Sequence, residues 1–189
     1  MKAHLDGERL RVSGAIRLNV ALGELRAIEV RGDALTFHIA DERIDLALGA
    51  KTAAAWAQAI ARPKSLLEKL GIKAGQRVCV LGLADSFAAA IAKVTLVPPL
   101  SSLRGSFDAI FCAIDAERDL GRVARCRKHL LPAGALWVVS PKGKGAPVHE
   151  NLVRAAFSDA GLVDTKVVSF SATHTAVRAV IPVAARVRT

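Results

Sequence analysis

The sequence predicts an α/β protein built from two regions. In residues 1–62, apolar side chains alternate as they do in half-buried antiparallel strands, and a helix-spaced segment follows them. In residues 63–189, short apolar runs suited to buried strands alternate with helical segments, which is typical of a parallel sheet with helices. We therefore expect a small antiparallel β-meander with one helix (α+β), followed by a shortened, mostly parallel sheet.

The first region is predicted to contain five strands and a helix. The first three strands are expected over residues 9–12, 16–20 and 25–30. The next two strands form a hairpin whose apolar residues share one face: Leu35, Phe37, Ile39, Ile44, Leu46 and Leu48. The helix covers residues 51–60, with Ala53, Trp56 and Ile60 on one side. Arg62-Pro63 ends this helix and separates the domain of residues 1–62 from that of residues 63–189.

The second region is predicted to repeat strand and helix. The expected helices cover residues 65–70, 86–92, 116–131 and 148–160. The expected strands cover residues 78–81, 94–97, 107–114 and 135–140, with a closing antiparallel pair over 166–170 and 176–181. Because such sheets bind ligands at the carboxyl ends of their parallel strands, the residues that follow each strand are the candidate site.

The charge and the cysteines restrict the function further. The net charge is +10, and residues 1–62 hold nine Lys or Arg against eight Asp or Glu, so the basic field comes from the second region. Such a field favours anionic partners. No charge-free stretch reaches the ~18 apolar residues of a membrane span, and the N-terminus carries charges where a signal peptide is apolar. We expect a cytoplasmic protein without a membrane segment.

The three cysteines predict neither a disulfide framework nor a metal site, because they include no C-x-x-C pair. Cys79 and Cys112 lie in apolar runs and are interpreted as buried. Cys126 has Arg122 four residues before it and His129 three residues after it, and cations at that spacing would lower the pKa of a thiol. Cys126 is therefore either a reactive thiol or an inert, half-covered one.

A glycine motif is incomplete at the end of the first strand of the second region. Residues 77–86 read R-V-C-V-L-G-L-A-D-S, and Ala84 stands where the second glycine of a G-x-G-x-x-G loop would allow a phosphate or adenosyl group to approach. Asp85 and Ser86 are either ligand contacts or N-caps of the next helix, and Asp115 has the same two interpretations.

Residues 64–170 resemble a bacterial family described only as a domain of unknown function. The resemblance rests on K-L-G-I-K-A-G at 69–75, the strand at 78–82, Phe107-Asp108, L-P-A-G-A-L-W-V at 131–138 with Pro141-Lys142, and G-L-V-D at 161–164. More distantly, this order of elements is similar to class I S-adenosylmethionine-dependent methyltransferases. That resemblance implies a shortened Rossmann sheet.

The same resemblance implies a degenerate cofactor site. Active members of that class carry an acidic residue two places before the first glycine, where this chain has Val80, and no Asp or Glu between residues 87 and 107 is present to bind a ribose. The matching positions are Gly82, Ala84, Asp85, Ser86 and Asp115. We therefore predict no cofactor and a non-catalytic protein that binds an anionic small molecule or a protein partner. S-adenosylmethionine-dependent methyl transfer is the alternative.

Two basic segments are candidate binding surfaces. Lys142, Gly143 and Lys144 precede a predicted helix whose N-terminal amides would favour an anion. Arg118, Arg122 and Arg125 fall on one face of the helix expected over residues 116–131, so nucleic-acid binding is a second alternative. For both segments a solvated surface is the competing interpretation. No catalytic residue and no metal ligand are predicted.

Overall fold

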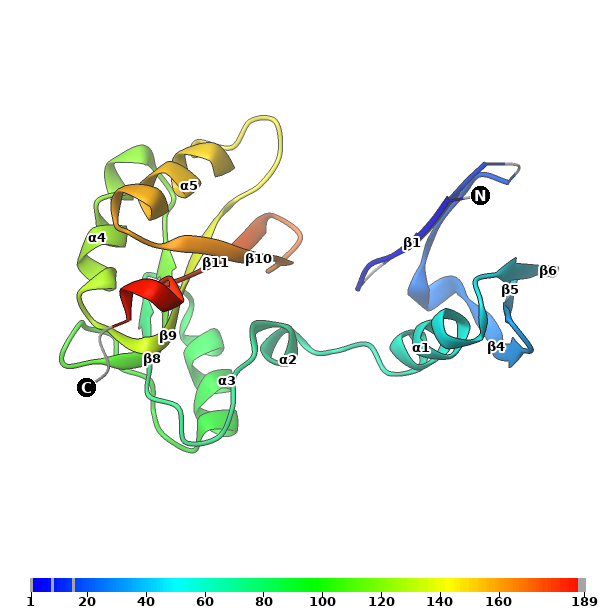
Figure 1. Cartoon of the computed structure of the whole chain (residues 1–189), viewed down its shortest axis with the longest axis horizontal. Helices are drawn as coiled ribbons and strands as arrows, with labels where there is room; N and C mark the ends of the chain where they lie inside the picture. Colours follow the sequence, from blue (N-terminus) through cyan, green and yellow to red (C-terminus); the bar gives the residue numbers. More distant parts are fainter. Residues whose placement is uncertain (1, 8, 15, 187–189) are drawn as a thin grey trace. The chain divides into compact units, whose positions relative to one another are not determined.

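The structure is a computed structural model that describes residues 2–7, 9–14 and 16–186. The chain divides into two compact units, Met1–Ser65 and Leu66–Thr189, and each is described by itself (Figure 1). None of the described helices is long and apolar enough to cross a membrane.

The first unit contains two antiparallel sheets in place of the single predicted meander. The strands of the first sheet are β1 (Lys2–Leu5), β2 (Arg9–Ser13) and β3 (Leu18–Ala21), and those of the second are β4 (Arg26–Arg31), β5 (Ala34–Ile39) and β6 (Glu42–Ala47). The two sheets separate because a 3-10 turn, η1 (Leu22–Glu24), interrupts the strands between them. The predicted hairpin is confirmed, since Leu35 lies opposite Leu46 and Phe37 opposite Ile44.

Helix α1 (Ala50–Ala61) completes the core of this unit. Ala53 and Ile60 are buried, as their helical spacing predicts, and Trp56 packs at the edge of the same core. The positive φ of Gly49 (80°) turns the chain from β6 into this helix.

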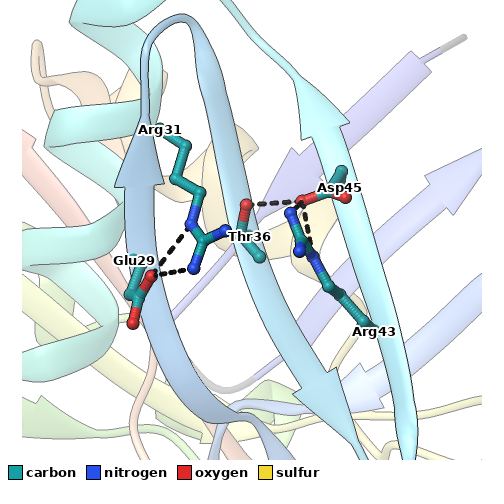
Figure 2. A network of polar contacts seen from close by, with 5 residues as sticks. All are labelled: Glu29, Arg31, Thr36, Arg43 and Asp45. Atoms are coloured by element: carbon teal, nitrogen blue, oxygen red, sulfur yellow. Dashed lines mark hydrogen bonds and ion pairs between the residues drawn. The ribbon is translucent and has the colours of Figure 1, made fainter.

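A polar row crosses the other face of the second sheet (Figure 2). Thr36 on β5 lies opposite Glu29 on β4 and opposite Asp45 on β6. The Thr36 hydroxyl donates a hydrogen bond to Asp45, Arg43 forms an ion pair with Asp45 at 3.1 Å, and Arg31 forms one with Glu29 at 2.8 Å. Each acid of the row therefore has an arginine of its own.

The second unit is built on a five-stranded mixed sheet of Rossmann type, with strand order β10-β11-β9-β8-β7. The strands are β7 (Val78–Leu81), β8 (Phe107–Ala113), β9 (Leu130–Pro141), β10 (Val163–Ser169) and β11 (His174–Val180). The first three are parallel and the last two are antiparallel to their neighbours. This confirms the α/β fold class and the predicted closing pair.

Helices cover both faces of this sheet. Helices α2 (Leu66–Leu70) and α3 (Asp85–Thr95) pack on the face that carries Phe111 and Trp137. Helices α4 (Arg122–Arg127) and α5 (Glu150–Asp159) pack on the face that carries Ile110 and Leu136. The central strands are consequently apolar on both sides, so polar side chains emerge mainly at the strand ends.

Two predicted elements differ in the structure. The strand expected over residues 94–97 is absent, because α3 continues to Thr95, whose hydroxyl donates to the carbonyl of Ile91 at 3.0 Å. The helix expected over residues 116–131 is reduced to a 3-10 turn, η2 (Glu117–Asp119), and α4. It ends early because β9 already begins at Leu130, which pairs with Phe107.

Candidate functional site

The order in which successive segments are added to the sheet reverses at β7. After α3, Leu100 lies on the outer side of β7, where its amide donates to Val78 O at 2.9 Å and its carbonyl accepts from Val80 N at 2.8 Å. The next strand, β8, pairs with the opposite side of β7. The carboxyl ends of β7 and β8 therefore flank a topological switch point, the place where open α/β sheets bind their ligands.

A cavity of about 220 Å³ opens at this switch point, and we call it the crevice. It is lined by Gly82, Leu83, Ala84, Ala113, Asp115, Val139, Phe170 and His174. Gly82 has a φ of +72°, and a Cβ atom on it would lie 3.3 Å from the Cβ of Ala113. A side chain at this position would be strained and would narrow the crevice, so glycine keeps the ends of β7 and β8 accessible.

Two titratable side chains meet at the crevice. Nε2 of His174, at the start of β11, lies 3.9 Å from Oδ1 of Asp115, which follows β8. Nδ1 of His174 lies 2.8 Å from the Thr173 hydroxyl. When that hydroxyl accepts a hydrogen bond from Nδ1–H, Nε2 carries the free lone pair and is able to take a proton.

The turn between β10 and β11 holds His174 in place. The Ser171 hydroxyl accepts hydrogen bonds from the backbone amides of Thr173 at 3.2 Å and His174 at 3.0 Å. Phe170 packs edge-to-face against Phe87, with ring centroids 5.0 Å apart. The turn is therefore anchored by hydrogen bonds on one side and by the aromatic core on the other.

The structure brings together three of the five residues at the predicted cofactor positions. Gly82, Ala84 and Asp115 line the crevice, whereas Asp85 and Ser86 form the exposed first turn of α3 and are not among its lining residues. The capping interpretation is wrong, because Ala84 is the N-cap of α3 and makes no side-chain cap. Asp115 does not cap η2 either, since Ala116 holds that position.

Sequence reasoning missed Phe170 and His174. Both flank a turn between antiparallel strands, and the first residue of an antiparallel strand lies at the edge where its parallel neighbours end. His174 lies opposite Pro141, the last residue of β9, and so reaches the crevice. The predicted antiparallel pair contained this signal, because its turn must lie at the edge where β9 ends.

The predicted anion-binding loop lies outside the crevice. The ammonium group of Lys142 donates to the Ser169 hydroxyl at 3.1 Å, while Gly143 and Lys144 are exposed. Helix α5 begins at Glu150, two residues later than expected, and the carboxylate of Glu150 occupies its first turn. Anion binding by Lys142, Gly143 and Lys144 stays a prediction.

The arginine stripe is not formed as predicted. Arg118 lies in η2, while Arg122 and Arg125 lie in α4, so the three residues do not share a helix face. Arg122 is also engaged elsewhere, because it donates to Ala113 O at 3.0 Å and forms an ion pair with Asp119 at 2.9 Å. Its guanidinium thereby fixes the end of β8 beside Gly82.

The cysteines are buried, and the reactive interpretation of Cys126 is wrong. A hydrogen bond to Cys112, together with burial, raises the pKa of Cys126. Burial raises the pKa of Cys79 to about 11. Over residues 2–7, 9–14 and 16–186, no cluster of His, Cys, Asp or Glu could hold a metal ion.

Comparison with known proteins finds similarity to solved structures alone. No family model and no curated relative matches the chain. A methyltransferase from Aquifex aeolicus, described as S-adenosylmethionine-dependent, is 18% identical, with a TM-score of 0.48 over 60% of this chain and 86% of that one. Fibrillarin from Aeropyrum pernix, solved with S-adenosyl-L-methionine, is 16% identical, with a TM-score of 0.47 over 69% and 74%.

A third similar structure, a TehB-like methyltransferase from Corynebacterium glutamicum, is 13% identical, with a TM-score of 0.47 over 70% of this chain and 97% of that one. Identities this low indicate the fold alone. No family model supports the predicted bacterial family of unknown function. Two of these structures are described as S-adenosylmethionine-dependent methyltransferases and the third as fibrillarin with bound S-adenosyl-L-methionine, and none is described as the non-catalytic binding protein that the sequence analysis predicted.

Proposed function

We propose that the second unit is an S-adenosylmethionine-dependent methyltransferase whose cofactor enters the crevice. The observation that carries this proposal is the position of the crevice, at the carboxyl ends of β7 and β8 and at the switch point of the sheet. When bound, S-adenosylmethionine supplies an electrophilic methyl group. The chain's own residues must hold the cofactor, orient the acceptor and accept its proton.

The residues of the crevice fit part of the cofactor. Gly82 leaves room where a Cβ atom would close the approach between the strands, and the carboxylate of Asp115 offers an acceptor for a cationic group. The cavity of about 220 Å³ is smaller than the ~300–1,000 Å³ of sites that enclose a whole ligand. Gly82, Ala84 and Asp115 would hold the part that lies at the switch point, and the remainder would lie in the open mouth.

His174 is the residue best placed to move a proton. Its imidazole is about one-third exposed, at 35%, and its Nε2 faces the carboxylate of Asp115. A hydroxyl or amine acceptor in the crevice would transfer its proton to Nε2, and Asp115 would stabilise the resulting imidazolium. Thr173 and the Ser171 turn orient the ring for this role.

Calorimetric titration with S-adenosylhomocysteine tests the cofactor site. We expect binding in the micromolar range, about 8 kcal/mol, for the unchanged chain. Gly82→Val should abolish it, whereas Gly161→Val should not, because Gly161 has a similar φ of +67° but open space around its Cβ position. Absence of binding to the unchanged chain, or equal loss in both variants, would overturn the proposal.

Methyl transfer is tested separately with methyl-labelled S-adenosylmethionine and pooled small-molecule, protein and RNA acceptors. His174→Gln should keep affinity for S-adenosylhomocysteine and reduce transfer about 100-fold, which is the usual contribution of a general base. A chain that binds the cofactor but labels no acceptor in any pool would contradict the catalytic part of the proposal.

A further inference from the structure

A second cavity, of about 360 Å³, lies at the opposite end of the same sheet, and we call it the amino-end cavity. Its lining includes Asp108, near the start of β8, and Ala133 and Ala135, in the first half of β9. Helix α2 and the turn that follows it form another wall. No lining residue is shared with the crevice, so this cavity is independent of the proposed cofactor site.

Two cations are placed side by side in this cavity. Arg178 on β11 lies opposite Lys166 on β10 and opposite Trp137 on β9. Residues directly opposite in an antiparallel pair have Cβ atoms about 5 Å apart on the same face, and like charges in such a pair repel. We call these three residues the cationic row: the cations Arg178 and Lys166, and the buried Trp137 that lies next to Arg178.

The guanidinium of Arg178 has no acidic partner among the residues that the structure describes. Nη1 of Arg178 donates a hydrogen bond to the Thr165 hydroxyl at 3.1 Å. Burial lowers the pKa of Arg178, and the positive charge of Arg186 adds to this effect. The guanidinium is thus partly removed from water without a counter-ion to stabilise it.

The ammonium of Lys166 also keeps binding capacity. It donates to the carbonyl of Lys69 at 2.6 Å, at the end of α2, and two of its three N–H groups remain for another acceptor. Of the two acids in the lining, Asp108 already accepts a hydrogen bond from the amide of Arg77 at 2.8 Å.

The rest of the lining defines what kind of molecule fits. Lys69 and Lys73 raise the number of cations to four, against the two acids Glu68 and Asp108. Leu70, Ile72 and the alanines provide an apolar surface beside these charges. A volume of about 360 Å³ exceeds the space that a bare oxyanion needs and lies within the range of small organic ligands.

We propose that the amino-end cavity binds a small phosphorylated molecule. The Arg178 guanidinium donates to two phosphate oxygens, Lys166 donates to the same group, and the organic part lies against the apolar lining. The anion removes the repulsion between the two cations, and this gain favours binding here over binding to other basic surfaces.

Calorimetric titration with inorganic pyrophosphate, at constant ionic strength, tests this site. We expect saturable binding to the unchanged chain. The affinity should be about tenfold weaker in Arg178→Gln and in Lys166→Gln, because each variant loses a charge-assisted hydrogen bond. Lys93→Gln is the matched control, since Lys93 is an exposed lysine of α3 outside the cavity. Its affinity should equal that of the unchanged chain.

Three outcomes overturn the proposal: no saturable heat, equal weakening in Lys93→Gln and Lys166→Gln, or unchanged affinity in Arg178→Gln. If circular dichroism shows that Arg178→Gln does not fold, Lys166→Gln decides, because Lys166 is exposed and its substitution leaves the core intact. S-adenosylhomocysteine titration of Lys166→Gln should match the unchanged chain. If the unchanged chain bound pyrophosphate but not S-adenosylhomocysteine, the proposed function would be contradicted and the proposed phosphate site would not.

Discussion

Each unit carries a polar row that crosses three neighbouring strands, and the two rows differ in charge balance. In the first unit, Glu29 and Asp45 flank Thr36, and each acid has its own arginine (Figure 2). In the second unit, the cationic row places Arg178 beside Lys166, with no ion pair to an acid among the described residues. The first row is neutralised within the chain, whereas the second leaves positive charge facing a cavity.

The architecture explains why the rows differ. The second sheet of the first unit packs its apolar face against the core, and the charged side chains on its other face are about half exposed, so water solvates them even though Thr36 between them is buried. Helices cover both faces of the sheet in the second unit, and a charge there must either find a partner or reach an opening. Unneutralised charge at a cavity of a covered sheet is therefore stronger evidence for a ligand than charge on an open sheet.

The largest expected effect comes from truncating the residue that anchors the cationic row in the core. Trp137 is 1% exposed and stacks on Phe111 with ring centroids 6.1 Å apart. Trp137→Ala should lower the free energy of unfolding by about 3–5 kcal/mol. Thr36→Ala, at the centre of the other row, removes one hydroxyl and should cost about 1 kcal/mol.

Hydrogen exchange in β9 and in β5, followed by mass spectrometry, measures the two losses separately. The Trp137 substitution should accelerate exchange in β9 and leave β5 unaffected. Similar losses of unfolding free energy in Trp137→Ala and Thr36→Ala would show that the two rows depend equally on burial in the core, and would contradict the comparison.

A smaller effect is expected for the paired arginine of the second unit. Arg122 donates to Ala113 O and forms an ion pair with Asp119, but its side chain is 38% exposed. Solvent screening therefore limits the loss in Arg122→Ala to about 1 kcal/mol. Arg125 is exposed and has no side-chain partner among the described residues, so Arg125→Ala should change the urea midpoint little. Equal effects would mean that the contacts of Arg122 contribute nothing.

The unpaired arginine should behave in the opposite way. Arg178→Gln removes the repulsion with Lys166 and should raise the free energy of unfolding by about 0.5 kcal/mol at low salt. The gain should vanish near ~1 M NaCl, where the screening length falls to about 3 Å. Thermal denaturation at a series of salt concentrations measures it. A loss of stability that salt does not change would show that Arg178 is not repelled by its neighbour.

The sequence predicted those parts of the fold that local patterns encode. Alternation correctly predicted a hairpin with Leu35, Phe37, Ile44 and Leu46 on one face, and the apolar runs located β8 and β9. The sequence pattern did not predict the length of α3, because the β-branched residues at 94–97 favour a strand. In the structure, the burial of Thr95 and its hydrogen bond to the carbonyl of Ile91 extend the helix instead. Tertiary packing outweighed local propensity there.

The site was predictable only where it depends on single strands. Gly82 and Asp115 follow strands that the sequence identifies, and both line the crevice. His174 depends on the register of β11 against β9, which a sequence pattern does not specify. The cationic row depends further on an irregularity between Asp164 and Lys166 that brings Lys166 opposite Arg178.

The smallest expected effect concerns the pH dependence of the first row. The hydrogen bond from Thr36, and then the bond from Arg43, lower the pKa of Asp45. Because the pKa in the folded state is lowered, Asp45 stabilises the fold above its unfolded-state pKa, and this contribution is lost as the pH falls through the folded-state pKa. Thr36→Val should therefore raise the pKa of Asp45 toward its ordinary value of about 3.9. The free energy of unfolding should then fall less steeply as the pH is lowered.

Carboxyl-carbon NMR titration of Asp45 measures this shift, with Arg43→Gln as the companion variant. The rise should be larger in Thr36→Val than in Arg43→Gln, because the hydroxyl is the larger cause of the lowered pKa. The reverse order would show that the arginine neutralises the row by itself. The first row would then resemble a pair of surface ion pairs beside a threonine, and the contrast with the cationic row would rest on charge alone.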